Sequence, residues 1–311
     1  EIASCLVGSE MCIRDSVRSM SPSVDLSAEF ATAQQRVRML QQQPQAFPHP
    51  VDPMEPVECV ETHISWVLLA GDFAYKFKKP LQLDFLDFST RALRHAACEE
   101  ELRINRRTAP GLYLGVVGLV SDAAKDASAT LRVVPWQGAP SGAEPAVWMR
   151  RFDQESLFAT ALDAHRVSPA QIDQLARHVA QFHATAAVAA GATTWGTAAA
   201  VQAPVGDCLA ALLPSVAGAL PGQGPLLAQV TSWCQHEGQA LAPTFEARRA
   251  AGRVRECHGD LHLANIALID GEAQLFDALE FSPALRWIDC VADIAFVVMD
   301  LAAHGLSLIH I

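Results

Sequence analysis

Several common sequence signals are missing from this chain of 311 residues. No apolar run reaches the roughly 18 residues that a membrane-spanning helix needs, so we expect no membrane segment. None of the eight cysteines forms a C-x-x-C pair or a zinc-binding spacing, which favours reduced thiols and a cytoplasmic location. The G-x-x-x-x-G-K-[ST] phosphate-binding loop is absent as well. The sequence therefore argues against a membrane protein, a zinc-stabilised domain and a P-loop protein.

Positive charge is also scarce, because 23 Lys and Arg residues stand against 34 Asp and Glu residues, for a formal net charge of -11. A nucleic-acid backbone needs clustered Lys and Arg, so the composition argues against a general nucleic-acid binder. It does not exclude ATP, which needs only a local lysine and a metal ion. Half of the residues are hydrophobic, which predicts a helix-rich globular protein with one large domain or two lobes.

The most informative stretch covers residues 253–281 and reads RVRECHGDLHLANIALIDGEAQLFDALEF. It predicts a strand at 253–257, a polar loop at 258–265 and a hairpin with strands at 266–269 and 274–276. Asp270-Gly271 is a strong two-residue hairpin turn signal, and the hairpin ends on Asp277. Three polar side chains, those of Asp260, Asn265 and Asp277, are therefore expected at one end of the hairpin.

This trio suits phosphoryl transfer from ATP. One carboxylate accepts the proton of the attacking hydroxyl, while an amide oxygen and a second carboxylate hold the magnesium ion that neutralises the phosphates. In the kinase loop H-R-D-x-x-x-x-N the Asp and the Asn are five residues apart. Asp260 and Asn265 repeat this spacing, with His258 two residues before the Asp. For Asp260 alone a plain turn is the simpler interpretation, but the whole string favours a catalytic loop.

The string H-G-D-L-H-L-A-N resembles the H-G-D-x-H-x-x-N loop of the aminoglycoside phosphotransferase and choline kinase-like family. The resemblance implies an α+β, two-lobed protein-kinase-like fold, with an antiparallel-sheet N-lobe that carries one helix and a mainly helical C-lobe. It also implies that Asp260 is the catalytic base and that Asn265 and Asp277 are the magnesium ligands. His262 either contacts phosphate or substrate or braces the loop, and for His258 we expect bracing.

Three strands are predicted before residue 80, at 57–61, 65–70 and 73–79. The third reads FAYKFKK and places Lys76 and Lys78 on one face and Tyr75 and Phe77 on the other. A kinase-like site needs a strand lysine that reaches the α- and β-phosphates. Lys76 fits that position and Lys78 is the reserve candidate, while an edge strand protected by lysines is the plainer alternative.

The glycine-rich loop that covers the phosphates in kinases is absent from this region. Thr62 and Ser65 lie where that loop would be, so their hydroxyls and neighbouring backbone amides would have to cover the phosphates. The last predicted N-lobe strand leads by analogy into the hinge between the lobes, where backbone groups near Met149 to Phe152 would hold adenine.

A helix is predicted to start at Ser89 or Thr90 and to run to about Thr108, with Glu101 on its inward face. An inward acidic residue is costly unless it is paired. We therefore assign Glu101 as the partner of Lys76, with Glu100 as the alternative and a solvated acidic run as the plain interpretation. Further strands are predicted at 112–120, 131–134 and 146–152, and a polar hairpin is predicted at 121–128.

The remaining pattern is helical. Ser168 and Gln171 form a capping box, and the stripe behind them predicts a core helix that ends at His183. We also expect a surface helix at 26–43 and a connector of small residues at 186–206. Three more helices are expected at 208–220, 225–241 and 243–251. The resemblance further implies that Asp289 or Asp293 hydrogen-bonds the catalytic loop, although Asp289 could equally be a helix N-cap.

The domain prediction has five parts. Both ends, 1–16 and 305–311, look like adaptor-derived sequence. Between them we expect an N-terminal helix and linker at 17–50, a nucleotide-binding N-lobe at 51–152 and a catalytic C-lobe at 153–304. The chain resembles most the N-terminal half of bacterial proteins that carry a P-loop kinase as their second half. On this hypothesis the native segment is truncated.

The expected activity is transfer of the γ-phosphate of ATP, with Mg2+, to a hydroxyl of a small molecule. There is no A-P-E segment or long activation loop, which favours small-molecule phosphotransferases over protein kinases. The alternatives are a nucleotide-binding pseudo-enzyme and a metal-dependent phosphoesterase, and the latter lacks its G-D-x-x-D and G-N-H motifs. No nucleic-acid or membrane partner is expected. The sequence indicates neither the substrate nor the oligomeric state.

Overall fold

The computed structural model describes residues 24–83, 85–122, 130–219 and 222–306. The predictions for the N-terminal segment, for most of the polar hairpin and for most of the C-terminal tail lie outside these residues. The chain divides into two compact units, the first built from 1–178, 260–282 and 297–311 and the second from 179–259 and 283–296. The predicted division between an N-lobe and a C-lobe near residue 152 stays a prediction.

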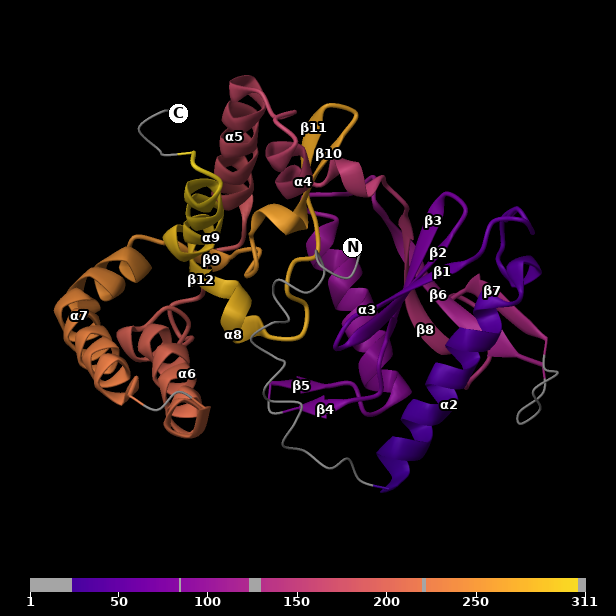
Figure 1. Ribbon diagram of the computed structural model, residues 1–311, viewed down its shortest axis with the longest axis horizontal. Helices are drawn as coiled ribbons and strands as arrows, with labels where there is room; N and C mark the ends of the chain where they lie inside the picture. The colour runs from indigo at the N-terminus through magenta and orange to yellow at the C-terminus, as the bar shows by residue number, and fades with distance from the viewer. Residues whose placement is uncertain (1–23, 84, 123–129, 220–221, 307–311) are drawn as a thin grey trace. The chain divides into compact units, whose positions relative to one another are not determined.

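A six-stranded antiparallel sheet dominates the N-terminal part of the first unit (Figure 1). In spatial order its strands are β1 (Glu58–Glu61), β2 (Ser65–Ala70), β3 (Phe73–Lys78), β8 (Glu144–Arg150), β6 (Tyr113–Ser121) and β7 (Leu131–Pro135). The three strands predicted before residue 80 are confirmed to within a residue at each end. The last strand ends at Arg150, so Phe152 lies beyond it rather than within it.

Two helices pack on the sheet (Figure 1). Helix α3 (Arg91–Asn105) packs through Cys98 and Leu102 against Tyr113 and Val147. Its first turn is capped by the Thr90 hydroxyl, which accepts a hydrogen bond from the backbone N–H of the third helical residue at 3.3 Å, as a start at Ser89 or Thr90 predicts.

Helix α2 (Val24–Gln41) corrects the expectation of a surface helix. Val37 and Leu40 are buried with Trp66 and Tyr75 in one hydrophobic cluster, which also contains Phe77. The apolar spacing of this helix is sparse, so its partner could not be deduced from the helix alone. The face of β3 that carries Tyr75 and Phe77 supplies that partner, which leaves the lysine face of β3 for other contacts.

The burial of α2 can be tested with Leu40, whose exposed fraction is 0%. Leu40→Ala should lower the free energy of unfolding by about 2–5 kcal/mol, because the substitution leaves a cavity between helix and sheet. Gln35→Ala, on the exposed side of the same helix, is the matched control and should change little. Denaturant unfolding of both variants measures the effect, and equal small losses would contradict the packing of α2 on the sheet.

Helix α5 (Pro169–Thr185) begins as the capping box predicts. The backbone N–H of Ser168 donates to the side-chain oxygen of Gln171 at 2.8 Å, and the Ser168 hydroxyl accepts from the Gln171 backbone at 3.4 Å. The apolar stripe behind the cap is buried, so its assignment to the core is confirmed; it consists of Ile172, Leu175, Val179 and Phe182.

The helices of the second unit are longer than expected. Helix α6 (Ala198–Ala219) begins within the predicted connector, and α7 (Gly224–Ala250) continues through Pro243, where we expected a new helix to start. Both predictions were wrong for a related reason. Proline removes one helical hydrogen bond, but the many alanines around it have the highest helix propensity of any residue. The connector is likewise rich in alanine, so its later part is helical.

The hairpin at the end of the informative stretch is confirmed. Strands β10 (Ile266–Ile269) and β11 (Glu272–Leu275) are antiparallel, and the turn residues Asp270 and Gly271 have φ of 53° and 83°. Positive φ at both positions is the mark of a type I′ turn. In the second unit, β9 (Val254–Glu256) pairs with β12 (Trp287–Asp289).

The shorter elements are η2 (Pro44–Ala46), β4 (Gln82–Leu83), β5 (Leu86–Asp87), η3 (Gln154–Ser156), α4 (Phe158–Asp163), η4 (Leu263–Asn265) and α8 (Pro283–Arg286), and the last helix is α9 (Cys290–Ala303). The chain is thus α+β, with an antiparallel sheet in its N-terminal region and a mainly helical C-terminal part, as predicted. Among the described helices, none is both long and apolar enough to cross a membrane.

Candidate functional site

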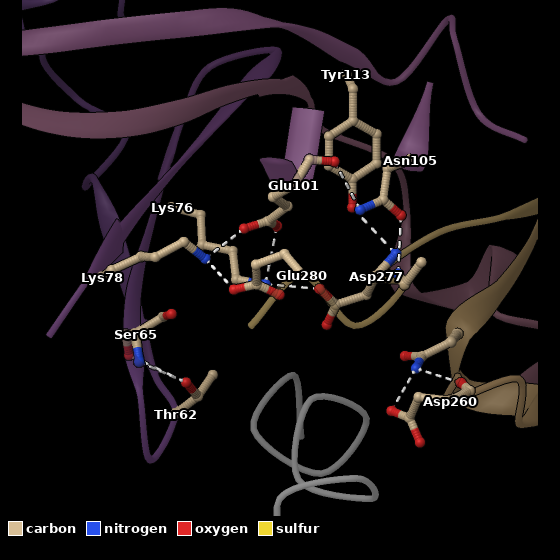
Figure 2. Close-up of polar contacts among 12 residues, drawn as sticks. Thr62, Ser65, Lys76, Lys78, Glu101, Asn105, Tyr113, Asp260, Asp277 and Glu280 are labelled. Carbon is tan, nitrogen blue, oxygen red and sulfur yellow. Dashed lines mark hydrogen bonds and ion pairs between the residues drawn. The ribbon is translucent and has the colours of Figure 1, made fainter. Parts of the chain in front are cut away.

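A strand lysine, a helix glutamate and an aspartate meet on the lysine face of β3 (Figure 2). The Lys76 ammonium lies 3.0 Å from a Glu101 carboxylate oxygen on α3 and 2.6 Å from an Asp277 carboxylate oxygen, just after β11. Glu101 is completely buried, whereas Glu100 forms a surface pair with Arg103 at 2.7 Å. Of the two glutamates we considered, Glu101 is the one that faces the lysine.

Lys78 belongs to the same group. Its ammonium lies 2.6 Å from the other carboxylate oxygen of Glu101 and also bonds Glu280. Burial lowers the pKa of Lys76 and Lys78, but the neighbouring carboxylates outweigh it and raise both pKa values above the usual lysine range. Both lysines are therefore charged at neutral pH, and Glu101 is shared between them.

The backbone at Asp277 is held by neutral hydrogen bonds. Its φ of 60° is left-handed, a conformation that aspartate tolerates better than most residues. Its N–H donates to the Tyr113 hydroxyl at 3.1 Å, and the N–H of Ala278 donates to the Asn105 side chain at 2.9 Å. Burial, followed by the charge of Asp277, raises the pKa of Tyr113 well above its usual range, so this hydroxyl stays protonated.

Asp260 and Asn265 meet across the polar loop. The Asn265 amide nitrogen donates to the Asp260 backbone carbonyl at 2.9 Å and to its carboxylate at 3.0 Å, which leaves the amide oxygen as the atom that a cation can use. The turn of η4 brings the two residues together, since the Asn265 N–H donates to the His262 carbonyl at 2.9 Å. The five-residue spacing thus has a local structural basis.

The hairpin brings this loop and Asp277 to the same end. The N–H of Phe276 donates to the Asn265 carbonyl at 3.0 Å, directly continuing the ladder of β10 and β11. Ala264 and Asp277 line one cavity. The predicted gathering of Asn265 and Asp277 at the hairpin end is therefore present in the backbone.

That cavity is mostly apolar with a charged end. Lys76, Tyr113 and Asp277 are among its polar lining residues, and Met149 and Phe152 are among its apolar ones. The remaining lining residues are Val67, Leu69, Ala74, Leu112, Arg150, Arg151, Gln154, Leu157, Ala264 and Phe276. Four predicted site residues, Lys76, Met149, Phe152 and Asp277, thus share one cavity. An apolar pocket with a few convergent polar groups is the usual form of a small-molecule site.

Thr62 and Ser65 bond to each other in the turn between β1 and β2. The Thr62 hydroxyl accepts from the Ser65 N–H at 2.9 Å and donates to the Ser65 carbonyl at 3.2 Å, and both residues are buried. Lys79 bonds the Thr62 carbonyl and pairs with Glu61 at 2.8 Å. Among the described residues Thr62 and Ser65 do not line the cavity, so contact with phosphates stays a prediction for them.

In the second unit, Asp293 braces the start of the polar loop. Its carboxylate accepts from the backbone N–H groups of His258 and Gly259 at 3.1 and 2.9 Å and lies 2.8 Å from the His183 ring nitrogen. Burial raises the pKa of Asp293, but these hydrogen bonds outweigh it and hold the pKa below its usual range. Asp289 instead pairs with Arg248 at 2.6 Å, so of these two aspartates Asp293 is the one that contacts the loop.

His183, Cys257 and Cys290 bring one potential metal-ligand atom each to within 4.8 Å of one another. The His183 Nε2 atom already bonds Asp293, and the Cys257 thiol donates to the Ile288 carbonyl at 3.5 Å. A closed tetrahedral site needs four donors. Among the described residues, three donors lie within this distance of one another.

His262 gives a pH test of the loop. Its ring nitrogen lies 3.4 Å from an Asp260 carboxylate oxygen, an ion-pair contact without good hydrogen-bond geometry. Burial lowers the pKa of His262, but the carboxylate outweighs it, so the pKa is raised above 6.5. A raised histidine pKa stabilises the fold fully below pH of about 6.5, and this stabilisation is lost as the pH rises through the folded pKa.

We therefore expect the melting temperature to fall from about pH 6.5 upward by an amount that His262→Gln removes. Melting curves between pH 5.5 and 8.5 would measure the difference between the two proteins. His236→Gln, an exposed change on α7, serves as the control and should keep the unaltered profile. A His262→Gln profile parallel to that of the unaltered protein would contradict the contact with Asp260.

Three residues that contact the group around Lys76 and Asp277 were not predicted from the sequence: Asn105, Tyr113 and Glu280. Asn105 and Tyr113 hold the backbone at residues 277 and 278, and nothing in their local sequence signals this. Glu280 had a weak signal. It lies three residues after Asp277 in the apolar segment FDALEF, where an unpaired acid would be costly.

Mycobacterial proteins are similar to this chain in sequence. No protein-family model matches the chain. Uncharacterized protein Rv2004c of Mycobacterium tuberculosis strain H37Rv is 33% identical over 259 residues, which cover 83% of this chain and 48% of that protein. The same values hold for uncharacterized protein Mb2027c of Mycobacterium bovis. The chain thus spans about half the length of the curated relatives it matches. A P-loop kinase in the remaining half stays a prediction.

Two solved structures are also similar. A choline/ethanolamine kinase family protein from Mesorhizobium loti is 12% identical, with 88% of this chain and 73% of that chain covered and a TM-score of 0.40. Aminoglycoside phosphotransferase APH(3'')-Id from Streptomyces rimosus, in complex with ADP and streptomycin, is 19% identical, with 91% and 85% covered and a TM-score of 0.39. Because both scores are below 0.5, the architecture described above depends on its own strand order and helices.

Proposed function

We propose that this chain is an ATP- and magnesium-dependent phosphotransferase of protein-kinase-like fold that moves the γ-phosphate to a hydroxyl of a small molecule. One observation carries the proposal. Lys76 on β3 contacts both Glu101 of α3 and Asp277 at the charged end of an apolar cavity. A strand lysine paired with a helix glutamate beside a metal-binding aspartate is the arrangement that kinases use to hold nucleotide phosphates.

In the proposed complex the nucleotide occupies this cavity with its phosphates toward Lys76 and Asp277. The base lies against the apolar wall beside Met149 and Phe152. The backbone N–H groups of Arg150 and Arg151 donate to the carbonyls of Leu112 and Asp72 at 2.9 and 2.8 Å, so these two groups are not the donors to its ring nitrogens. The phosphates then reach the charged end, where Lys76 binds the α- and β-phosphates. Thr62 and Ser65 shape the turn between β1 and β2. The buried Glu101 keeps the Lys76 side chain extended and charged.

Magnesium suits the donors at this end. Mg2+ prefers hard oxygen ligands and is usually held by one or two protein groups together with substrate phosphates. The carboxylate of Asp277 and the amide oxygen of Asn265 are such donors. The group of Lys76, Lys78, Glu101, Asp277 and Glu280 has three carboxylates for two ammonium groups, an excess of negative charge that a cation compensates. When bound, the ion neutralises the phosphate oxygens during transfer.

Asp260 acts as the base. Its carboxylate is positioned by Asn265 and accepts the proton of the substrate hydroxyl as the oxygen attacks the γ-phosphorus. The bond between the γ-phosphorus and the bridging oxygen of ADP breaks, and ADP leaves. His262 lies 3.4 Å from the same carboxylate and braces it within the loop.

A non-catalytic nucleotide-binding module is the second candidate. The observation that favours it is the turn of Thr62 and Ser65, whose Thr hydroxyl and backbone groups are already engaged with each other and lie outside the cavity lining of the described residues. Without a covering loop, the γ-phosphate would be held less firmly for transfer. The two candidates differ only in turnover.

The experiment that separates them is a thermal-shift screen with ATP, with and without Mg2+, followed by an ADP-release assay over a panel of small alcohols. The proposal predicts a magnesium-dependent shift with ATP and ADP release that depends on one class of alcohol. A shift with no release for any alcohol favours the non-catalytic module. No shift with ATP would overturn both candidates.

A further inference from the structure

Five charged side chains form one continuous chain of contacts on the lysine face of β3, buried except at the Asp277 end (Figure 2). Asp277 contacts Lys76 at 2.6 Å, Lys76 contacts Glu101 at 3.0 Å, Glu101 contacts Lys78 at 2.6 Å, and Lys78 bonds Glu280. The proposed phosphate and magnesium contacts use only the Asp277 end. The opposite end, Lys78 and Glu280, has no role in them.

The Lys78–Glu280 pair is costly to bury. The side chain of Lys78 is 0% exposed and that of Glu280 is 4% exposed. Burial is the main reason that the pKa of Glu280 is raised above its usual range. Replacing a buried ion pair with apolar residues of similar size is often neutral or even stabilising. Fold stability alone is therefore a poor explanation for this pair.

The positions of the two pairs suggest a better one. Lys76 and Lys78 lie two residues apart on one face of β3, and Asp277 and Glu280 lie three residues apart on one segment. The two ion pairs therefore join the same strand to the same segment. The first pair must loosen when Asp277 turns to a cation, because that carboxylate is then shared. The second pair takes no part in the proposed cation and phosphate contacts.

We propose that the Lys78–Glu280 pair keeps the segment from Asp277 to Glu280 fixed against β3, so that the Asp277 carboxylate stays in place for Mg2+ with the nucleotide. Glu280 is thus a positioning residue that acts through Asp277. The inference depends on the proposed nucleotide site. Groups that orient metal ligands typically contribute about 10- to 100-fold to metal affinity, and this sets the expected effect.

The variant Glu280→Gln tests it, because the amide keeps the size of the side chain but removes the negative charge that pairs with Lys78. Asn105 and Tyr113 continue to hold the backbone at 277 and 278, so the protein should still fold. The measurement is ATP affinity by titration calorimetry across a series of Mg2+ concentrations. Glu100→Gln, a surface glutamate on the same helix as Glu101, is the matched control.

We expect Glu280→Gln to raise the Mg2+ concentration needed for half-maximal ATP affinity by about 10- to 100-fold, and Glu100→Gln to leave it unchanged. ATP affinity at saturating Mg2+ should return toward that of the unaltered protein, a recovery that a merely structural role would not produce. Equal Mg2+ requirements in both variants, or a lowered melting temperature as the only change, would overturn this inference and leave the proposed function intact. If the unaltered protein showed no magnesium-dependent ATP binding, both this inference and the proposed function would be contradicted.

Discussion

Asp260→Asn should reduce the rate of phosphoryl transfer by about 10²- to 10⁴-fold, the range that a general base contributes. The amide has nearly the same shape and can still accept the hydrogen bond from Asn265, but it cannot take the proton of the attacking hydroxyl. Binding of ATP with Mg2+ should be unchanged, because the base contacts the acceptor and not the nucleotide. Steady-state kinetics with an acceptor from the alcohol panel, together with ATP titration, measure the two quantities separately.

Asp173→Asn, an exposed change on α5, controls for the substitution itself and should keep full activity. If Asp260→Asn retained the rate of the unaltered protein, Asp260 would not be the base. If it lost ATP binding as well, Asp260 would belong to the nucleotide site instead of the acceptor site. Either result would remove the mechanism in its present form.

Asp277→Asn should lower the transfer rate by about 10²- to 10³-fold, the cost of removing one group that stabilises developing charge, and should weaken magnesium-dependent ATP binding at the same time. The loss of binding distinguishes it from Asp260→Asn. Lys76 keeps its contact with Glu101 at 3.0 Å, so the buried group remains paired and the protein should fold.

The chain offers a close control for this change. Asp270 also has a left-handed backbone, with φ of 53° against 60° for Asp277, and it lies in the turn of the same hairpin. Asp270→Asn makes the same chemical change at the same kind of backbone position away from the charged group. Kinetics and ATP titrations on both variants should separate them clearly. Similar behaviour of the two would contradict a metal-binding role for Asp277.

The features that could be predicted from the sequence are those fixed by local geometry. The five-residue spacing of Asp260 and Asn265 becomes a single turn, and Asp270-Gly271 specifies its hairpin turn almost alone. Strand alternation placed Lys76 on the face opposite Tyr75, and helical spacing placed Glu101 inward. Each of these depends on a few neighbouring residues.

The features that were missed depend on distant partners. Glu280 meets Lys78 across 202 residues of sequence, and a helix with a weak apolar pattern such as α2 reveals its buried side only when the sheet is in place. Pro243 is accommodated within α7 because the surrounding helix tolerates the loss of one hydrogen bond. Local sequence rules give the unfavourable free energy of a buried charge or a proline in a helix. Whether contacts elsewhere in the fold offset that free energy cannot be read from the local sequence.

The most direct measurement is a calorimetric titration of the unaltered protein with ATP, once in excess Mg2+ and once with the metal chelated. The proposed site predicts saturable binding of a single ATP per chain in Mg2+, with the affinity falling sharply on chelation, because Lys76 alone cannot neutralise the phosphates. Absence of binding, or equal affinity with and without Mg2+, would contradict a nucleotide site formed by Lys76, Asn265 and Asp277.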